Sequence, residues 1–261
     1  MKTKTILQIL VIFAVALASF SCSLLSKRYD KKEKVEYKLN TIGKTKLTLN
    51  NITGHINISS SDSVTGLVIN AEKVGWVKKK DLDKPLEDIT IEIDTASSTI
   101  NITSHMNRGK SWIHFERHSN EINYDIKLPP GLALTVENID GDVTLGSVSN
   151  ETNISVTNGE INFDYPTGKQ ELEVKNGSIR GSVDSVKNLK LDVMNGKVSL
   201  DIGKSYNGEI KADVVNGKIR YSKLEIEDVT TDKKSLRGYI GSRQNQISIN
   251  VLNGNITLTG K

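Results

Sequence analysis

The sequence has little of several residue types on which common protein classes depend. Among its 261 residues are 1 Cys, 4 Pro and 5% aromatic residues. A single cysteine excludes a disulfide framework and a cysteine-based zinc site. The few aromatic residues argue against an aromatic-lined sugar cleft. The formal net charge is only +4, without a long basic stretch, so no nucleic-acid partner is expected.

The first residues, 1–21, have the pattern of a signal peptide. Two lysines precede an apolar run, Ile6 to Phe20, that is too short and too poorly flanked for a stable membrane span. The single cysteine, Cys22, follows directly and resembles the cysteine of the bacterial lipobox, which becomes the lipidated first residue of the mature protein. Cleavage after Ala18, leaving a free thiol, is the alternative. A lone cysteine here favours a lipid on Cys22, which would anchor the protein to a bacterial membrane, expected to be the outer membrane, as an extracytoplasmic protein.

The residues after Cys22 are polar and charged up to Glu36. Their lysines could lie against anionic lipid headgroups, but Asp30, Glu33 and Glu36 dilute the positive charge. We therefore predict that residues 22–36 form a solvated tether between the lipid and the fold.

An internal repeat dominates the rest of the chain. The unit Gly-x-Ile or Gly-x-Val recurs from Gly141 onward at intervals of 18, 18, 19, 21, 21 and 16 residues, and an earlier copy begins at Gly54. Five of the glycines follow an asparagine, with alternating apolar residues on either side. Asn-Gly between such runs is a strong turn signal because both residues tolerate a positive φ. The predicted structural turns are Asn158 and Gly159, Asn176 and Gly177, Asn195 and Gly196, Asn216 and Gly217, and Asn253 and Gly254.

Two architectures share this turn signal, a meander of separate hairpins and a β-solenoid. The near-constant period of about 19 residues favours the solenoid, whose coils stack about 4.8 Å apart. Stacked coils would bring the asparagines within hydrogen-bonding reach of each other, or each asparagine would serve only its own turn. In the predicted register eight aliphatic residues point inward: Val156, Ile161, Val174, Ile179, Val193, Val198, Ile219 and Ile256.

The chain before the repeats is less regular. Its segment Leu47 to Gly54 closely matches Leu134 to Gly141, and a Pro-Pro-Gly break at 129–131 starts the regular array. Long helical periodicity is absent after Cys22. We predict an all-β, single-chain β-solenoid, with an irregular N-terminal β half at 37–129 and a regular repeat half at 130–261.

The segment from Ile126 to Gly131, followed by Leu134-x-Val136 and a Gly-x-Val unit, resembles the bacterial adhesin-like domain family of unknown function. That family places a Pro-Gly element before a series of Val-x-x-Asn-Gly-x-Ile coils. The sequence is also similar to the adhesin-head domains of autotransporters. The resemblance covers about residues 40–261. It implies an extracytoplasmic β-solenoid with an adhesive or envelope role, and it supplies no catalytic residues.

One constellation has metal-ligating residue types. His114, Glu116 and His118 alternate, so on a strand they would share a face, where they could hold a metal ion. Ile113 and Phe115 would then take the inner face and leave the three polar residues in solvent, which is the interpretation that we favour. No metal and no other cofactor is therefore expected.

Three further features have simple structural explanations. Asp140 and Asp142 flank Gly141, which is typical of a turn and lacks the acidic pattern of a calcium loop. The two tryptophans, Trp76 and Trp112, could stack on a sugar if exposed, but burial in the sheet stack is favoured. No Gly-x-Ser-x-Gly motif occurs, so a nucleophile elbow is not expected.

These observations predict a lipid-anchored cell-envelope protein that acts by binding or by presenting a surface rather than by catalysis. The expected partners are the membrane, through the lipid, and an unidentified protein or glycan. A polysaccharide-processing β-helix enzyme is the alternative; it would depend on one or two carboxylates, such as Glu116 or Asp142, but the acidic residues are scattered. Envelope-stress sensing and a structural spacer remain open.

Overall fold

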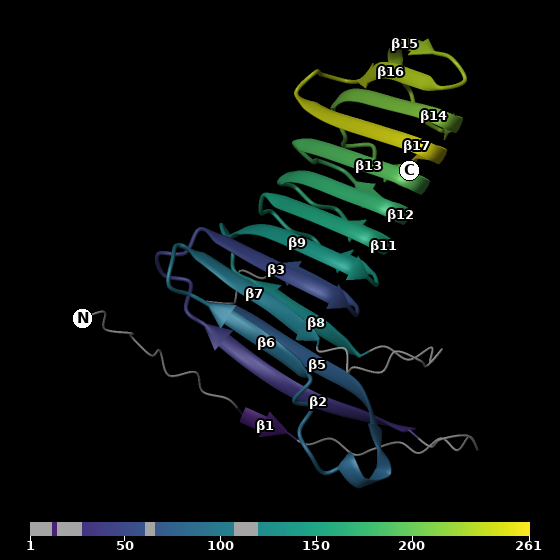
Figure 1. The fold of residues 1–261 in the computed structure, drawn as a ribbon. Helices are drawn as coiled ribbons and strands as arrows, with labels where there is room; N and C mark the ends of the chain where they lie inside the picture. The colour runs from purple at the N-terminus through teal and green to yellow at the C-terminus, as the bar shows by residue number, and fades with distance from the viewer. Residues whose placement is uncertain (1–11, 15–27, 61–65, 107–119) are drawn as a thin grey trace.

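Strands dominate the structure, a computed structural model that describes residues 12–14, 28–60, 66–106 and 120–261 (Figure 1). The described residues contain 17 strands and one short 3-10 helix, η1 (Lys79–Asp81). The strands are β1 (Ile12–Ala14), β2 (Arg28–Leu39), β3 (Lys46–Thr53), β4 (Ile56–Ser60), β5 (Leu67–Lys78), β6 (Ile89–Asp94), β7 (Thr99–Met106), β8 (Glu121–Leu128), β9 (Ala133–Asp140), β10 (Val143–Leu145), β11 (Thr152–Asp164), β12 (Lys169–Val183), β13 (Asn188–Ile202), β14 (Gly208–Ser222), β15 (Glu227–Thr231), β16 (Ser235–Ile240) and β17 (Asn245–Gly260).

Each regular coil is one long strand that bends at its Asn-Gly pair. The first half of β11 pairs with β9 and its second half with β10, so the bend carries the strand from a first sheet layer into a second. The strands β12, β13, β17 and β14 continue the stack in parallel and in register, with Asn158 beside Asn176 and Asn176 beside Asn195. This arrangement confirms the all-β solenoid predicted from the period.

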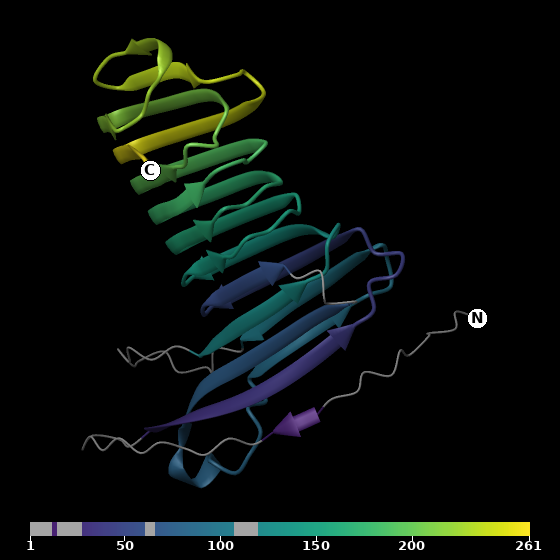
Figure 2. The same cartoon turned by 180° about the vertical axis from the view of Figure 1, so that it is seen from behind.

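The spatial order of the coils departs from their sequence order in two places (Figures 1 and 2). The C-terminal strand β17 lies between β13 and β14 and pairs with both. Likewise β3 lies between β7 and β9, while β4 lies between β8 and β10. The matching segments Leu47 to Gly54 and Leu134 to Gly141 are therefore neighbours, because β3 and β9 pair in parallel.

Antiparallel strands occupy both ends of the stack. At the C-terminal end, β16 pairs with the first half of β14, and β15 pairs with β16. At the N-terminal end, β2, β5 and β8 are antiparallel neighbours, and β6 pairs with β7 in the same way. The Gly-x-Ile unit at Gly238, which ends the second of the two 21-residue intervals, is not a coil corner, because Gly238 lies within antiparallel β16.

The core fills the space between the two layers with columns of Val, Ile and Leu. Seven of the eight residues predicted to point inward are at most 3% exposed. The eighth, Ile219, lies on the last coil and is only partly buried against the core. Burying one such side chain contributes about 1.5–3 kcal/mol, so the aligned columns are the main source of stability.

The tether predicted for 22–36 is too long, because Arg28 to Glu36 belong to β2, which pairs with β5 over its full length. Val35 and Leu39 are each 8% exposed and join the buried side of the sheet, while Lys32 forms an ion pair with Glu72 on the outer side, at 3.1 Å. The many charged residues of this segment leave few apolar residues to mark the alternation of a strand in the sequence.

The segment predicted as a signal peptide contains β1, which pairs antiparallel with Lys34 to Glu36 of β2. Among the described residues, no helix combines the length and the apolar character needed to cross a membrane.

Candidate binding surface

A column of hydrogen-bonded side chains, the corner column, runs along the edge where the coils bend. Each of its asparagines is exposed and donates its side-chain amide to the side-chain oxygen of the preceding member, over 2.7–3.0 Å. The structure thus shows a ladder between coils, one of the two possibilities left open by the sequence. In spatial order the members are Asp140, Asn158, Asn176, Asn195, Asn253 and Asn216.

The glycine after each of these asparagines lets neighbouring coils approach closely. Gly159, Gly177 and Gly196 have φ of 148°, 146° and 153°. A Cβ on Gly196 would lie 1.6 Å from the carbonyl oxygen of Gly177. Gly217 lies outside this φ region, yet a Cβ there would lie 1.5 Å from the carbonyl oxygen of Gly254. The predicted turns therefore form a continuous structural edge.

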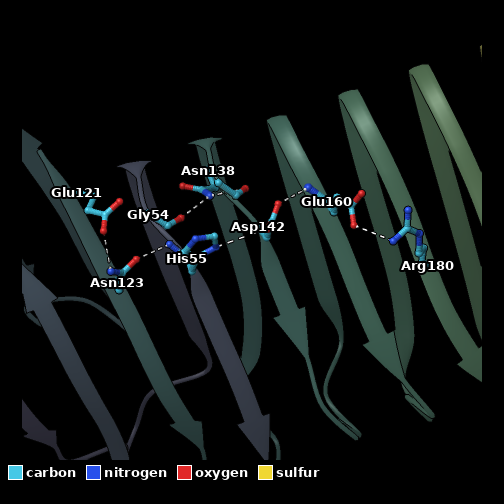
Figure 3. A network of polar contacts seen from close by, with 9 residues as sticks. Gly54, His55, Glu121, Asn123, Asn138, Asp142, Glu160 and Arg180 are labelled. Carbon is cyan, nitrogen blue, oxygen red and sulfur yellow. Dashed lines mark hydrogen bonds and ion pairs between the residues drawn. The ribbon is translucent and has the colours of Figure 1, made fainter. Parts of the chain in front are cut away.

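A first polar row crosses the outer face of the second layer (Figure 3). Asn123 accepts the backbone N–H of His55 (2.7 Å), and Nδ1 of His55 lies 3.6 Å from the carboxylate of Asp142. Asp142 in turn accepts the backbone N–H of Glu160 (2.8 Å), whose carboxylate pairs with Arg180 (3.2 Å). These groups hold neighbouring strands together, and Asp142 contributes to this through both His55 and Glu160.

A second polar row runs beside the first, two residues further along each strand. Cross-strand pairing aligns its members directly, from β2 through β5, β8 and β4 to β10. Asn57, Asn70 and Asp125 are exposed, and their side chains form no hydrogen bond or ion pair with another residue in the described part of the chain. The row consists of Glu36, Asn70, Asp125, Asn57 and Thr144.

The two rows meet in a hollow of about 500 Å³, which we call the N-terminal hollow. Its lining includes the carboxylates of Glu36, Glu72 and Asp125 and one lysine, Lys34. Lys38 pairs with Glu36 and Lys34 with Glu72, so Asp125 is the lining carboxylate without an ion pair among the described residues. His55 and three asparagine amides complete the polar lining. Such a surface can donate and accept hydrogen bonds to hydroxyl, amide or ammonium groups.

Tyr124 forms part of the floor of this hollow and is only 2% exposed. Its hydroxyl is hydrogen-bonded to that of Ser104 at 2.8 Å. Burial raises the pKa of Tyr124 well above its usual value, so the phenol is neutral and supports the sheet from within.

A second hollow of about 540 Å³ lies on the first layer towards the C-terminal end. Met194, Leu252 and Val215, from adjacent strands β13, β17 and β14, are 48%, 44% and 55% exposed along it. Glu173 and Asp192 lie on the same lining. This groove is more apolar than the N-terminal hollow and offers few unpaired polar groups.

Several residues singled out in the sequence lie outside the described residues: Cys22, Trp112, His114, Glu116 and His118. Trp76 is half-buried in β5 and borders a third hollow beside η1. In the described part of the chain, no group of three or more His, Cys, Asp or Glu side chains could hold a metal ion.

Reasoning from the sequence missed the second polar row. The alternation of apolar and polar residues marks each of its members as outward-facing. The antiparallel pairing of β5 with β8 brings Asn70 beside Asp125, and that of β2 with β5 brings Glu36 beside Asn70. No repeat in the sequence indicates these pairings.

Comparisons with known proteins give similar solved structures and one family. None of the curated proteins compared matches the chain. A candidate cell adhesion protein from Clostridium sporogenes is similar in structure, with 15% identity and a TM-score of 0.49 over 90% of this chain and 100% of that one. A candidate adhesin from Bacteroides fragilis has 11% identity and a TM-score of 0.30, over 88% and 97%. The model of the Toastrack DUF4097 family matches residues 28–259, from the start of β2 into β17. The chain belongs to the Toastrack DUF4097 family.

Proposed function

We propose that this protein is a lipid-anchored, extracytoplasmic component of the bacterial cell envelope that binds a partner through the outer face of its solenoid and performs no catalysis. The observation that carries this proposal is the N-terminal hollow with its second polar row. There Asn57, Asn70 and Asp125 are exposed and unpaired within the described residues, whereas the neighbouring first row is hydrogen-bonded between strands.

The chemistry of the row suits recognition of a surface with many hydrogen-bonding groups, such as a glycan or a polar protein segment. An asparagine amide donates and accepts, and a carboxylate accepts two hydrogen bonds from adjacent donors. Neighbouring strands stand about 4.8 Å apart, so the three side chains can engage successive groups of one extended partner. The rigid sheet holds them in place, which lowers the entropic cost of binding.

Binding is tested with the triple variant Asn57→Ala, Asn70→Ala, Asp125→Ala in the full chain. Fluorescently labelled protein is applied to intact bacterial cells and to an array of purified glycans. We expect the triple variant to lose at least tenfold in apparent affinity, because several hydrogen bonds of about 0.5–1.5 kcal/mol each are removed together.

A matched control carries the same residue types on the outer side of the first layer. The variant Asn153→Ala, Asn188→Ala, Glu137→Ala also removes two exposed amides and one exposed carboxylate, whose side chains form no hydrogen bond or ion pair with another described residue. It should bind like the unmodified chain. Equal binding by both triple variants, with folding intact, would exclude the second polar row as the binding surface.

The anchor is tested separately through Cys22→Ser. If the cysteine carries the lipid, the variant lacks all of its acyl chains and should move from the membrane fraction into the soluble extracytoplasmic fraction. Stable anchoring needs more than one acyl chain. Membrane retention of the variant after normal processing would contradict the anchor without affecting the binding surface.

A further inference from the structure

The C-terminal strand occupies a position between two strands that follow one another in the sequence. Residues 203–207 connect β13 to β14, yet β17 separates them in space and pairs with both. All three share one register, with Asn195 beside Asn253 and Asn253 beside Asn216. Without β17, therefore, β13 and β14 can pair directly without any shift of register, as the other consecutive coils do.

Outside this position β17 would be an exposed apolar strand. Its five inward-facing residues are at most 2% exposed in the structure, so release of the strand opens a large apolar area to water. A released strand with unpaired backbone N–H and C=O groups can pair with the edge of another sheet. The five residues are Ile247, Ile249, Val251, Ile256 and Leu258.

The segment that leads into β17 is short. Asn207 of the β13–β14 connection binds its backbone and side chains, and within it Arg243 pairs with Asp228 of β15 at 3.0 Å. Asn207 accepts a hydrogen bond at its Oδ1 from the hydroxyl of Ser242 (2.7 Å), and its carbonyl oxygen accepts one from the side chain of Asn245 (2.9 Å). Gly241, directly before Ser242, has a φ of 61°. Residues 241–244 thus form a hinge, and Asn207 latches it to the strands that β17 separates.

We propose that β17 exchanges between two copies of this chain, so that each solenoid of the resulting dimer contains the C-terminal strand of the other. A second copy is the matching partner because its β17 has the apolar alternation, the Asn-Gly bend and the register that the position requires. Exchange of an identical element needs no new contact surface, since every contact of the closed monomer is remade in the dimer. This inference does not depend on the proposed binding function.

The test uses two chains that each carry one cysteine, in a Cys22→Ser background. Asn250 on β17 donates to Oδ1 of Asp192 on β13 at 2.8 Å, so these positions report where β17 lies. Chains with Asp192→Cys and chains with Asn250→Cys are mixed at high concentration, taken briefly into moderate urea and returned to buffer. A short bis-maleimide cross-linker is then added, and the products are separated on a denaturing gel.

Neither chain can form this cross-link alone, so exchange should yield a covalent heterodimer. The matched control mixes Glu173→Cys chains with Asp192→Cys chains, because these residues are aligned on β12 and β13 and neither strand is exchanged. A heterodimer from the first mixture and not from the control supports the proposal. Absence of a heterodimer from the first mixture, or equal yields from both, overturns it.

The latch is tested by the rate of heterodimer formation. With Asn207→Ala in both chains, we expect exchange to be about tenfold faster, the change that corresponds to about 1.4 kcal/mol of lost hydrogen bonding. Ser205→Ala is the control, since Ser205 lies in the same connection, is exposed and has no hydrogen bond to another described residue. Equal rates for the two variants would overturn the assignment of Asn207 as the latch.

Discussion

Asn253 donates its side-chain amide to Oδ1 of Asn195 across 2.8 Å, although the two residues are 58 positions apart in the chain. The hydrogen bond lies where the C-terminal strand enters the stack, so the corner column continues through β17 without a break. The ladder thus includes coils from distant parts of the sequence. The hydrogen bond between Asn253 and Asn195 forms only when these coils are stacked in the order that the structure shows.

Substituting a corner glycine should destabilise the fold strongly. In Gly196→Ala the new Cβ would lie 1.6 Å from the carbonyl oxygen of Gly177, on a backbone with φ of 153°. We expect the free energy of unfolding, measured in urea, to fall by about 2 kcal/mol or more. Gly146→Ala is the control, because the nearest atom to its Cβ lies at 3.5 Å; it should change stability by no more than about 0.5 kcal/mol. Similar losses in both variants would contradict the close approach of the coils.

Removing one rung of the corner column should cost less. Asn176 donates to Asn158 (3.0 Å) and accepts from Asn195 (2.9 Å), and all three are exposed. Asn176→Ala should therefore lower the free energy of unfolding by about 1 kcal/mol. The neighbouring variant Lys175→Ala removes an exposed side chain without a partner among the described residues and should be nearly neutral. If both variants unfold at the same urea concentration, the ladder contributes nothing to stability.

The core columns should be most sensitive in the middle of the stack. Ile179 is 0% exposed, whereas Ile219 on the last coil is only partly buried. We expect Ile179→Ala to cost about 2–5 kcal/mol and Ile219→Ala clearly less, because the end of the stack loses less buried area. Thermal and urea unfolding measure the difference. A larger loss for Ile219→Ala would show that the C-terminal end is covered in a way that the structure does not show.

Alkaline pH should weaken the fold through its buried phenols. Burial raises the pKa values of Tyr124 and Tyr206 far above the value of about 10 in an unfolded chain. Above pH 10 the unfolded chain loses these protons while the folded chain keeps them, so the free energy of unfolding should fall as the pH rises further.

The variant Tyr124→Phe tests how much the hydroxyl of Tyr124 contributes to this pH dependence. This variant should be less stable than the parent at neutral pH by about 1–2 kcal/mol, because Ser104 loses its buried partner, and it should decline less steeply above pH 10. Identical slopes for parent and variant between pH 9 and 11 would contradict the burial of this hydroxyl.

The regular half of the fold follows from local chemistry, and so do its turns. Asn-Gly pairs at a nearly constant period predict both the bend and the in-register stack. The spatial order of the coils is harder to predict from the sequence. The interval from Gly196 to Gly217 rises to 21 residues, and in the structure the connection between β13 and β14 spans the width of β17. The next interval is also 21, although Gly238 lies in an antiparallel strand, so the interval alone does not identify an inserted strand.

The binding surface is harder to predict for a related reason. Which strand lies beside which is decided by packing over the whole sheet and not by any one segment. Asn70 and Asp125 become neighbours through the antiparallel pairing of β5 and β8, and Glu36 joins them only because β2 is a strand rather than a tether. A polar row of this kind has no signature along the chain until the strand order is known.

The insertion of β17 also determines when the stack of coils can close during synthesis. The coils β9 to β13 can assemble in the order in which the chain is synthesised, but the position between β13 and β14 is filled by residues 245–260, which are synthesised after β14, β15 and β16. A nascent or truncated chain that ends after β14 can reach a closed stack that is one coil short. The finished stack therefore requires residues 245–260, and termination before them leaves a protein whose outer rows are shortened at the C-terminal end.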